Sequence, residues 1–415
     1  MALPLFKPAT SLDTPGSHFD WLHSPAHGTA VLWERVGSGS GRWHKLNPGD
    51  PHIPALMASQ VGQTDRYLTV NEFYAWRLVR NIKSLRAGYV DIDGSEDLPA
   101  AQEALRDARL PQPTLVIFSG RGMHLYWLHE PVPGAVLPVW QRCQDALLKA
   151  LLPIGGDPAA KDCTRVLRLA GTINSKSSTA VRGLIIDPEP YSFRHLCNEV
   201  LGYREPRERP IVRDLATARA ERGLPAPKGS IYARWHLVYQ DLLKIADWHL
   251  LGGIPEGARN DWLFLSAVSL SWFANPATLK SELERQAKAW TPGLTIAEVR
   301  SAIKSPLERA ARAAEGNRFE WQGEPCDPRY KFRRETLLEW MQPIIPPDLA
   351  PQLRAIVSSE VKAKHERERE AKRDRVAEGR HKASHSDSQE RAAPWEAMGL
   401  SRATYFRKKA LGTLT

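Results

Sequence analysis

The sequence predicts an α+β protein in which a strand-rich first half is followed by helical units. Two observations support this prediction. An apolar, β-prone run leads into Asp91, and two more such runs, Thr114–Phe118 and His124–Leu128, flank a glycine-containing connection that is typical of a β-hairpin. Beyond about residue 230 the apolar residues recur at helical spacing, and Thr295 with Glu298 forms the pattern of a helix capping box.

Composition narrows the class of partner. The chain has 415 residues, 42% of them apolar, and a formal net charge of +10. That length corresponds to about two or three domains, and the basic balance favours a polyanion such as nucleic acid, with a solubility role as the alternative. Neither a signal peptide nor an apolar run long enough to span a bilayer is visible, so we expect no membrane partner. The four cysteines contain no Cys-x-x-Cys pair, which predicts reduced thiols in a cytoplasmic protein and no zinc knuckle: Cys143, Cys163, Cys197 and Cys326.

The region before the first strong strand gives weaker signals. Val31–Val36 and Trp43–Lys45 are short candidates for strands in a stretch rich in Pro, Gly, His and Ser. A helix is expected over Asn71–Leu85, because Asn71 can cap it and the apolar residues that follow form one stripe. Further helices are expected over residues 99–109 and 139–152.

Asp91 and Asp93 close the strand that begins near Leu85. Successive side chains of a strand point to opposite faces, so these two carboxylates share one face, roughly 6–7 Å apart. Two such carboxylates repel each other unless a cation lies between them, and Mg²⁺ or Mn²⁺ prefers oxygen ligands. The alternative is that Asp-Ile-Asp-Gly only ends a strand and opens a turn.

The connection of the predicted hairpin carries a second candidate group. Ser119-Gly-Arg121-Gly-Met123 lies between the strands, and His124 opens the second one, where its side chain can face a neighbouring strand. Backbone N–H groups and the Arg121 guanidinium in such a turn suit a phosphate. The alternative is a glycine turn with an incidental histidine.

A third candidate lies between residues 155 and 176. Gly155-Gly156-Asp157 is followed by a short apolar segment that contains Arg165 and Arg168. Two arginines in a β-prone apolar segment favour a cleft lined for anions. The alternative is that both snorkel at the edge of a sheet.

These three segments, in this order, resemble the catalytic core of the archaeo-eukaryotic primase superfamily, and in particular the primase-polymerases of plasmids and phages. The matching features are Asp91-Ile-Asp93, the glycine-rich turn that ends in His124, and Asp157 followed by Arg165-x-x-Arg168-x-x-Gly171-Thr172-x-Asn174. Relatives usually carry Pro where this chain has Ala170, which affects the local turn rather than the chemistry.

The resemblance implies an RNA-recognition-like catalytic core. It implies that Asp91, Asp93 and a third carboxylate bind two divalent ions, Mg²⁺ or Mn²⁺, with Asp157 preferred over Asp162 as the third. His124 would contact the triphosphate of a nucleotide. The nucleotide site implied by the resemblance consists of Ser119, Gly120, Arg121, Gly122, His124, Arg165, Arg168, Asn174 and Lys176.

The second half is expected to support this core. The predicted organisation is a catalytic domain (1–200), a linker (201–230), a helical domain (231–312), a helical extension (313–360), a charged tether (361–391) and a helix-turn-helix tail (392–415). The helical domain resembles the C-terminal domain of primases, in which Arg259 and Asn260 would contact DNA. The tail resembles the origin-binding tail of colicin-plasmid Rep primases. Its second helix carries candidate DNA contacts: Arg402, Thr404, Tyr405, Arg407 and Lys408.

The predicted function is primer synthesis on a single-stranded DNA template from nucleoside triphosphates, together with binding of origin DNA. The chain has no Gly-x-x-x-x-Gly-Lys-Ser/Thr sequence, so a replicative helicase would be a separate partner. One alternative is an origin-binding initiator with little or no catalysis. Another is an Asp-x-Asp glycosyltransferase, against which the basic balance, the tail and the His124 hairpin argue.

Overall fold

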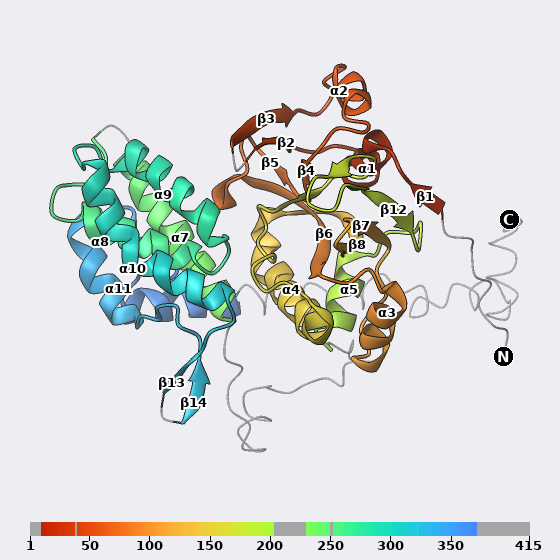
Figure 1. Cartoon of the computed structure of the whole chain (residues 1–415). Coiled ribbons are helices and arrows are strands. Elements are labelled where there is room, and N and C mark those ends of the chain that lie inside the picture. The colour runs from red at the N-terminus through yellow and green to blue at the C-terminus, as the bar shows by residue number, and fades with distance from the viewer. Residues whose placement is uncertain (1–9, 38–39, 203–229, 250–251, 322, 372–415) are drawn as a thin grey trace, which may run out of the picture.

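The computed structural model describes residues 10–37, 40–202, 230–249, 252–321 and 323–371. Within these residues two larger antiparallel sheets, a two-stranded sheet (β10 Ile173–Asn174 and β11 Thr179–Ala180) and several helices form one part of the molecule. A helical unit lies beside it (Figure 1). The predicted α+β class is therefore confirmed. The description of the core as RNA-recognition-like stays a prediction.

The larger sheet has six strands in the order β1-β12-β7-β8-β6-β5, and each neighbouring pair is antiparallel. The predicted hairpin is confirmed, because β7 and β8 pair with Ile117 opposite His124. The strand bounds are β1 Thr10–Leu12, β5 Glu72–Phe73, β6 Ile82–Asp93, β7 Leu115–Phe118, β8 Gly122–Pro133 and β12 Arg182–Ile185.

The long strand β6 has an edge that is only partly paired, and this edge lies beside the predicted site residues Asp91 and Asp93. Because β5 pairs only with Ile82 and Ser84, the backbone beyond Ala87 lacks a strand partner on that side. The helix α4 (Leu137–Leu151) covers this edge: Trp140 donates to the Ala87 carbonyl (3.0 Å), and the Gln144 amide bonds both backbone groups of Tyr89 (2.8 and 3.0 Å). Buried polar backbone groups need such partners, and α4 thereby fixes β6.

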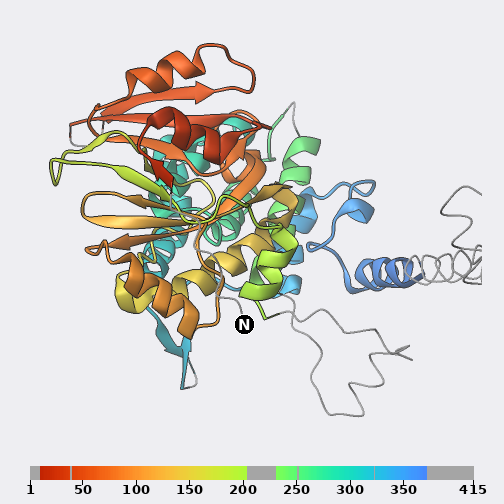
Figure 2. The ribbon, with the colours of Figure 1, turned by 90° about the vertical axis from the view of Figure 1, so that its right-hand side faces the viewer.

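Three helices cover one face of this sheet. Figure 1 shows α3 (Leu98–Asp107), α4 and α5 (Phe193–Val200) below the central strands, and Figure 2 shows the same layers edge-on. The helices predicted over 99–109 and 139–152 correspond to α3 and α4. The helix α1 (Pro15–His23) lies on the other side, with α2 (Ile53–Ser59) beyond it.

A second sheet of four strands lies above the first, in the order β3-β2-β4-β9. It consists of β2 Ala30–Val36, β3 Ser40–Leu46, β4 Arg66–Thr69 and β9 Val166–Arg168. The two weak candidates near Val31 and Trp43 are thus real strands. On one face Leu32, Leu46 and Leu68 join the core, which leaves the other face of this sheet available to line a cleft.

The helix predicted over Asn71–Leu85 is wrong. These residues form β5, a 3-10 turn over Val79–Asn81 and the start of β6. The apolar residues of this segment pack against different parts of the protein instead of forming one helix face. Phe73 joins the core, whereas Trp76 packs edge-on against Trp43. Asn71 caps no helix: it donates to the Cys163 carbonyl (3.1 Å) and accepts from the Arg86 N–H (2.9 Å).

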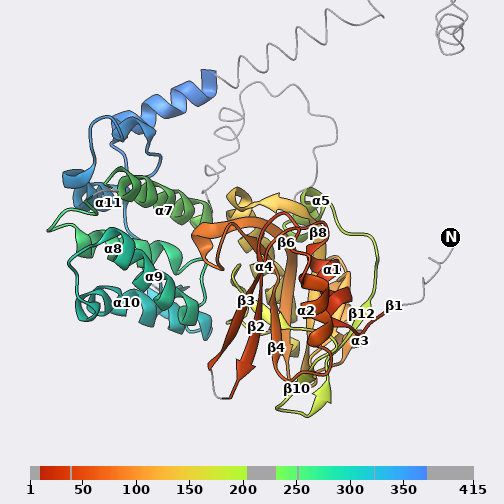
Figure 3. The same cartoon turned by 90° about the horizontal axis from the view of Figure 1, so that it is seen from above.

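The helical unit follows the two sheets and packs beside them (Figure 3). Thr295 and Glu298 form the predicted capping box at the start of α10, with both reciprocal hydrogen bonds present. A short hairpin, β13 Phe319–Trp321 and β14 Glu324–Cys326, follows it. The helices are α7 Ile231–Trp248, α8 Arg259–Leu270, α9 Pro276–Trp290, α10 Ile296–Ala314 and α11 Arg334–Met341.

Several predicted segments fall outside the described residues. These are most of the linker (203–229), the remainder of the tether beyond residue 371 and the helix-turn-helix tail (392–415). Residues 359–371, where the predicted tether begins, are helical. In the described part of the chain, no helix is long and apolar enough to cross a membrane.

Candidate active-site cleft

A cleft of about 880 Å³ lies between the two sheets and the helical unit. Residues of the larger sheet and its loops form one wall, and residues of the smaller sheet form the opposite wall. The start of α9 closes one side through Asn275, Ala277 and Thr278. The predicted site residues that line this cleft are Asp91, Asp93, Asp157, Asp162, Ser119, Arg121, His124, Arg165, Arg168, Asn174 and Lys176.

Asp91 and Asp93 lie at the C-terminal end of β6. Both line the cleft, as the alternation of strand side chains predicted. Burial raises the pKa of Asp91 to about 6, and the nearby Asp157 carboxylate adds to that rise against the opposing effects of Arg165 and Arg168. The pKa of Asp93 is also raised, by burial first and then by Asp91 and Asp157. The three carboxylates therefore repel one another in a partly buried cleft, which makes them candidates for a cation site.

Asp157 lies next to Asp91 because its loop continues along the free edge of β6. The Asp157 N–H donates to the Asp91 carbonyl (2.8 Å), and the Asp93 N–H donates to the Gly155 carbonyl (3.0 Å). The neighbouring Asp162 holds its own turn instead, since its Oδ1 accepts from the backbone N–H (3.1 Å) and the hydroxyl (2.6 Å) of Thr164. Asp157 is accordingly the better candidate for a third carboxylate beside the pair.

His124 faces this pair from the neighbouring strand. It lies directly opposite Asp91 in the β6–β8 register, and its Nε2 is 3.5 Å from Asp91 Oδ1. Burial first, then the positive charge of Arg168, lowers the pKa of His124 to about 3, so the imidazole is neutral near pH 7. Its Nδ1 is buried without a hydrogen-bond partner. A neutral imidazole of this kind suits contact with an anionic ligand without an ion pair to Asp91.

The donor types in the cleft fit Mg²⁺ or Mn²⁺, which take carboxylate oxygens. The residues that would hold such ions are Asp91, Asp93 and Asp157. Among the described residues, however, no three His, Cys, Asp or Glu side chains are grouped closely enough to form a metal centre. Arg165 instead approaches both Asp157 (3.6 Å) and Asp162 (3.8 Å), so its guanidinium supplies positive charge at this position.

The remaining cationic groups are held by residues that the sequence did not single out. Arg168 donates to Asp65 at 2.7 Å, and Asp65 also accepts from the backbone N–H (3.2 Å) and the hydroxyl of Ser175. Asn174 donates to the Ser119 carbonyl (2.6 Å), which joins the strand after Gly171 to the hairpin turn. Gly120 has a φ of +90°, and a Cβ there would meet Thr179 at 2.0 Å, so this turn requires glycine.

The wall opposite the carboxylates is aromatic. Trp43, Trp33, Tyr67 and Arg168 are paired residues of β3, β2, β4 and β9, and they form one row across the smaller sheet. The ring centroids of Trp33 lie 5.1 Å from those of Trp43 and 5.0 Å from those of Tyr67. A guanidinium covers each end, with Arg77 4.3 Å from the Trp43 ring and Arg168 4.9 Å from the Tyr67 ring. The alternating sequence around Trp33 and Trp43 was the available signal for this row.

Two groups of predicted site residues lie elsewhere. Gly120 and Gly122 shape the hairpin turn but do not line the cleft. Arg259 and Asn260 begin α8 outside the cleft, where Arg259 is 2.6 Å from Glu256 and also donates to the Pro292 carbonyl. The five predicted DNA contacts of the tail, from Arg402 to Lys408, lie outside the described residues.

Comparisons with known proteins give one curated relative and three solved structures. No protein-family model matches the chain. A curated replication protein from Clostridium perfringens is 28% identical over 342 residues, which cover 79% of this chain and 75% of that protein.

Three solved structures are similar at low identity. The AEP domain of the cyanophage S-2L primase-polymerase is 20% identical, with 44% of this chain and 94% of that chain covered and a TM-score of 0.34. Primase RepB′ is 16% identical, with 73% and 94% covered and a TM-score of 0.29. The catalytic domain of RepB′ in complex with initiator DNA is 17% identical, with 45% and 92% covered and a TM-score of 0.31.

The predicted resemblance to the archaeo-eukaryotic primase superfamily is confirmed as a similarity: the chain is similar to a replication protein, to a phage primase-polymerase and to a primase.

Proposed function

We propose that this chain is a DNA primase-polymerase of a plasmid or phage replicon, which joins nucleotides on a single-stranded DNA template. The observation that carries the proposal is the convergence of Asp91, Asp93, Asp157 and His124 on one cleft that is also lined by cationic and aromatic side chains. Repelling carboxylates beside several arginines suit a polyphosphate substrate that arrives with divalent cations.

In the proposed reaction the 3′-hydroxyl of a primer or first nucleotide attacks the α-phosphorus of a nucleoside triphosphate. A new P–O ester bond forms, the bond to the β-phosphate breaks, pyrophosphate leaves and the hydroxyl proton passes to solvent. Mg²⁺ or Mn²⁺ bound by Asp91, Asp93 and Asp157 would supply activation of the hydroxyl and stabilisation of the leaving group.

The chain's own cationic and neutral donors would position the triphosphate. Arg168 presents a guanidinium that Asp65 and the Tyr67 ring keep in place, and Lys176 extends the same side of the cleft. A neutral His124 can donate one hydrogen bond to a phosphate oxygen, because it forms no ion pair with Asp91. The aromatic wall of Trp33 and Tyr67 offers the flat surface that a base or sugar edge prefers.

The experiment incubates purified protein with single-stranded DNA, labelled nucleoside triphosphates and Mg²⁺ or Mn²⁺. The wild type should make primers, whereas Asp91→Ala combined with Asp93→Ala should make none and still bind DNA. Primer synthesis by the double variant at the wild-type rate would contradict the proposal.

The second candidate function is an origin-binding initiator with little or no catalysis. The observation that favours it is Arg165, which neutralises Asp157 where a cation ligand is needed. In that case the wild type would bind origin DNA and make no primers under any metal condition. We propose that the tail at residues 392–415 binds origin DNA. We further propose that the protein is cytoplasmic and that its helicase partner is a separate protein.

A further inference from the structure

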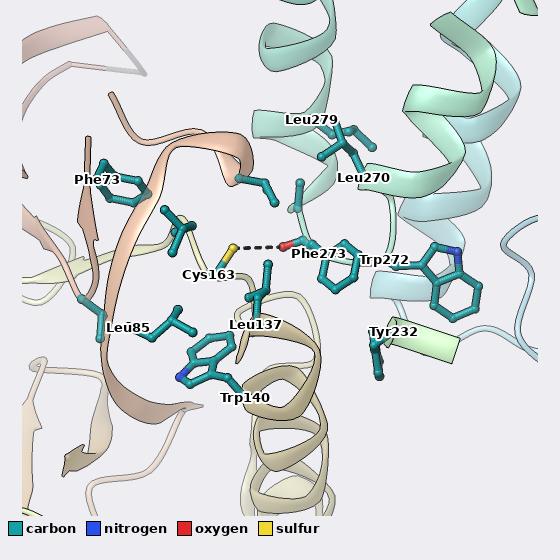
Figure 4. Close-up of a cluster of buried hydrophobic side chains, with 14 of the residues drawn as sticks. Phe73, Leu85, Leu137, Trp140, Cys163, Tyr232, Leu270, Trp272, Phe273 and Leu279 are labelled. Carbon is teal, nitrogen blue, oxygen red and sulfur yellow. Dashed lines mark hydrogen bonds between the residues drawn. The ribbon is translucent and has the colours of Figure 1, made fainter. Parts of the chain in front are cut away.

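One loop of the cleft is held by the helical unit as well as by the larger sheet. The loop after Gly156 carries Asp157, Asp162 and Arg165, and it contacts the turn between α8 and α9. Cys163 Sγ points at the Phe273 carbonyl from 3.7 Å, as Figure 4 shows, and Asn275 Nδ2 donates to the Ala159 carbonyl at 2.9 Å. The cleft is therefore assembled from parts of the chain more than 100 residues apart.

Asn275 connects α9 to this loop with an amide whose orientation is fixed. Its Oδ1 accepts the Ala277 N–H (2.8 Å) as the N-cap of α9, and its Nδ2 donates to the Ala159 carbonyl. Ala277 offers a donor and Ala159 an acceptor, so a flipped amide would satisfy neither. One side chain thus both starts a helix and holds a cleft loop.

Ala159 in turn holds the Asp157 carboxylate. Its N–H donates to Asp157 Oδ1 at 2.8 Å, while the backbone N–H of Asp157 is tied separately to Asp91. The backbone of Asp157 is thereby fixed by β6, whereas its carboxylate is held at Oδ1 by Ala159 and faces Arg165 with Oδ2 at 3.6 Å. A hydrogen bond from the helical unit to Ala159 consequently restrains which way the Asp157 oxygens point.

We propose that Asn275 is a positioning residue, through which the helical unit sets the Asp157 carboxylate for cation binding by way of Ala159. The inference rests on the proposed function, because it takes Asp157 as a cation ligand. It gives the helical unit a role inside the catalytic cleft. Partners that orient a metal-binding carboxylate typically change metal affinity by 10- to 100-fold when they are lost.

The test variant is Asn275→Ser, in which the hydroxyl still caps α9 but is too short to reach Ala159. The matched control is Thr295→Ala, which removes the exposed N-cap of α10 and touches no cleft loop. Thermal denaturation of both variants checks that the helical unit stays folded. Mn²⁺ binding is measured on the full chain by calorimetry, without nucleotide or DNA.

Asn275→Ser should weaken Mn²⁺ binding by about 10-fold, at the lower end of the range for such partners, while Thr295→Ala should leave it unchanged. In an Asp157→Asn background, Asn275→Ser should cause no additional loss, because the residue acts through Asp157. In primer synthesis, the Mn²⁺ concentration for half-maximal rate should rise by the same factor.

Equal Mn²⁺ affinity in Asn275→Ser and Thr295→Ala, or an undiminished loss in the Asp157→Asn background, would overturn the positioning role. A wild type that binds Mn²⁺ yet incorporates no nucleotide would refute the proposed polymerase alone. The affinity comparison would still decide the role of Asn275 in that case. A wild type that binds no Mn²⁺ would overturn both.

Discussion

Replacing Asp91 with Asn should stabilise the metal-free protein while it removes activity. Burial raises the pKa of Asp91 from 3.8 to about 6. One pKa unit corresponds to about 1.4 kcal/mol, so a difference of about 2 units means that the ionised carboxylate lowers the free energy of unfolding by about 3 kcal/mol. The asparagine amide has the same shape but no charge, so it avoids this cost. Substitutions of this kind at functional sites often stabilise a protein while they reduce its activity.

The pH dependence follows from the sign of that shift. A carboxyl with a raised pKa in the folded state destabilises the protein at pH values above about 6, where it is ionised in both states. The cost disappears as the pH falls from about 6 to about 4, where the folded protein already carries the proton. The stabilisation by Asp91→Asn should therefore be large at pH 8 and nearly absent at pH 4.

The assay is urea denaturation of wild type and Asp91→Asn at pH 8 and pH 4, without divalent ions. Mn²⁺ at pH 8 should shrink the difference, because it stabilises the wild type by binding the folded state. A variant that is less stable than the wild type at pH 8, or a difference that is the same at both pH values, would refute the reasoning.

Two further predictions concern the partner of Arg168 and the aromatic row of the smaller sheet. Asp65→Asn should lower the free energy of unfolding by about 1–3 kcal/mol and raise the Michaelis constant for nucleotide, because Arg168 loses its charged partner at 2.7 Å. Burial raises the pKa of Asp65, but hydrogen bonds from Ser175 and Arg168 outweigh this effect, so the net pKa is lowered. The stabilisation by Asp65 should therefore be lost as the carboxylate is protonated in acid. Equal denaturation curves of wild type and Asp65→Asn at pH 7 would contradict this prediction. Trp33→Ala should lower the free energy of unfolding by about 2–3 kcal/mol, because it removes two aromatic contacts. Trp248→Ala, at a residue that is 48% exposed, should lower it by less than about 1 kcal/mol. Thermal denaturation that ranks the two variants the other way would refute the role of the row.

The parts of the site that obey local rules could be predicted from sequence. Asp91 and Asp93 share a face because strand side chains alternate, and His124 lies opposite Ile117 because a short hairpin turn sets the register of β7 and β8. The capping box at Thr295 was equally local. Each of these features depends on residues within a few positions of one another or on one hairpin.

The remaining parts depend on contacts between distant segments. Asp65 meets Arg168 across 103 positions, and Asn275 meets Ala159 across 116, so no spacing pattern could reveal either pair. The apolar stripe over Asn71–Leu85 led to the wrong prediction of a helix for a related reason. Its residues are buried as a helix face would be, but the burial comes from a sheet, from Trp43 and from α9, where Glu282 accepts the Val79 N–H (3.1 Å).

The proposed reaction requires Asp91, Asp93 and Asp157 to bind divalent cations beside a bound nucleoside triphosphate. A crystal of the full chain grown with Mn²⁺ and a non-hydrolysable triphosphate tests it most directly, because Mn²⁺ gives an anomalous signal. We expect anomalous density bonded to these three carboxylates, with the phosphates between them and His124. Density at another location, with Arg165 still beside Asp157, would contradict it.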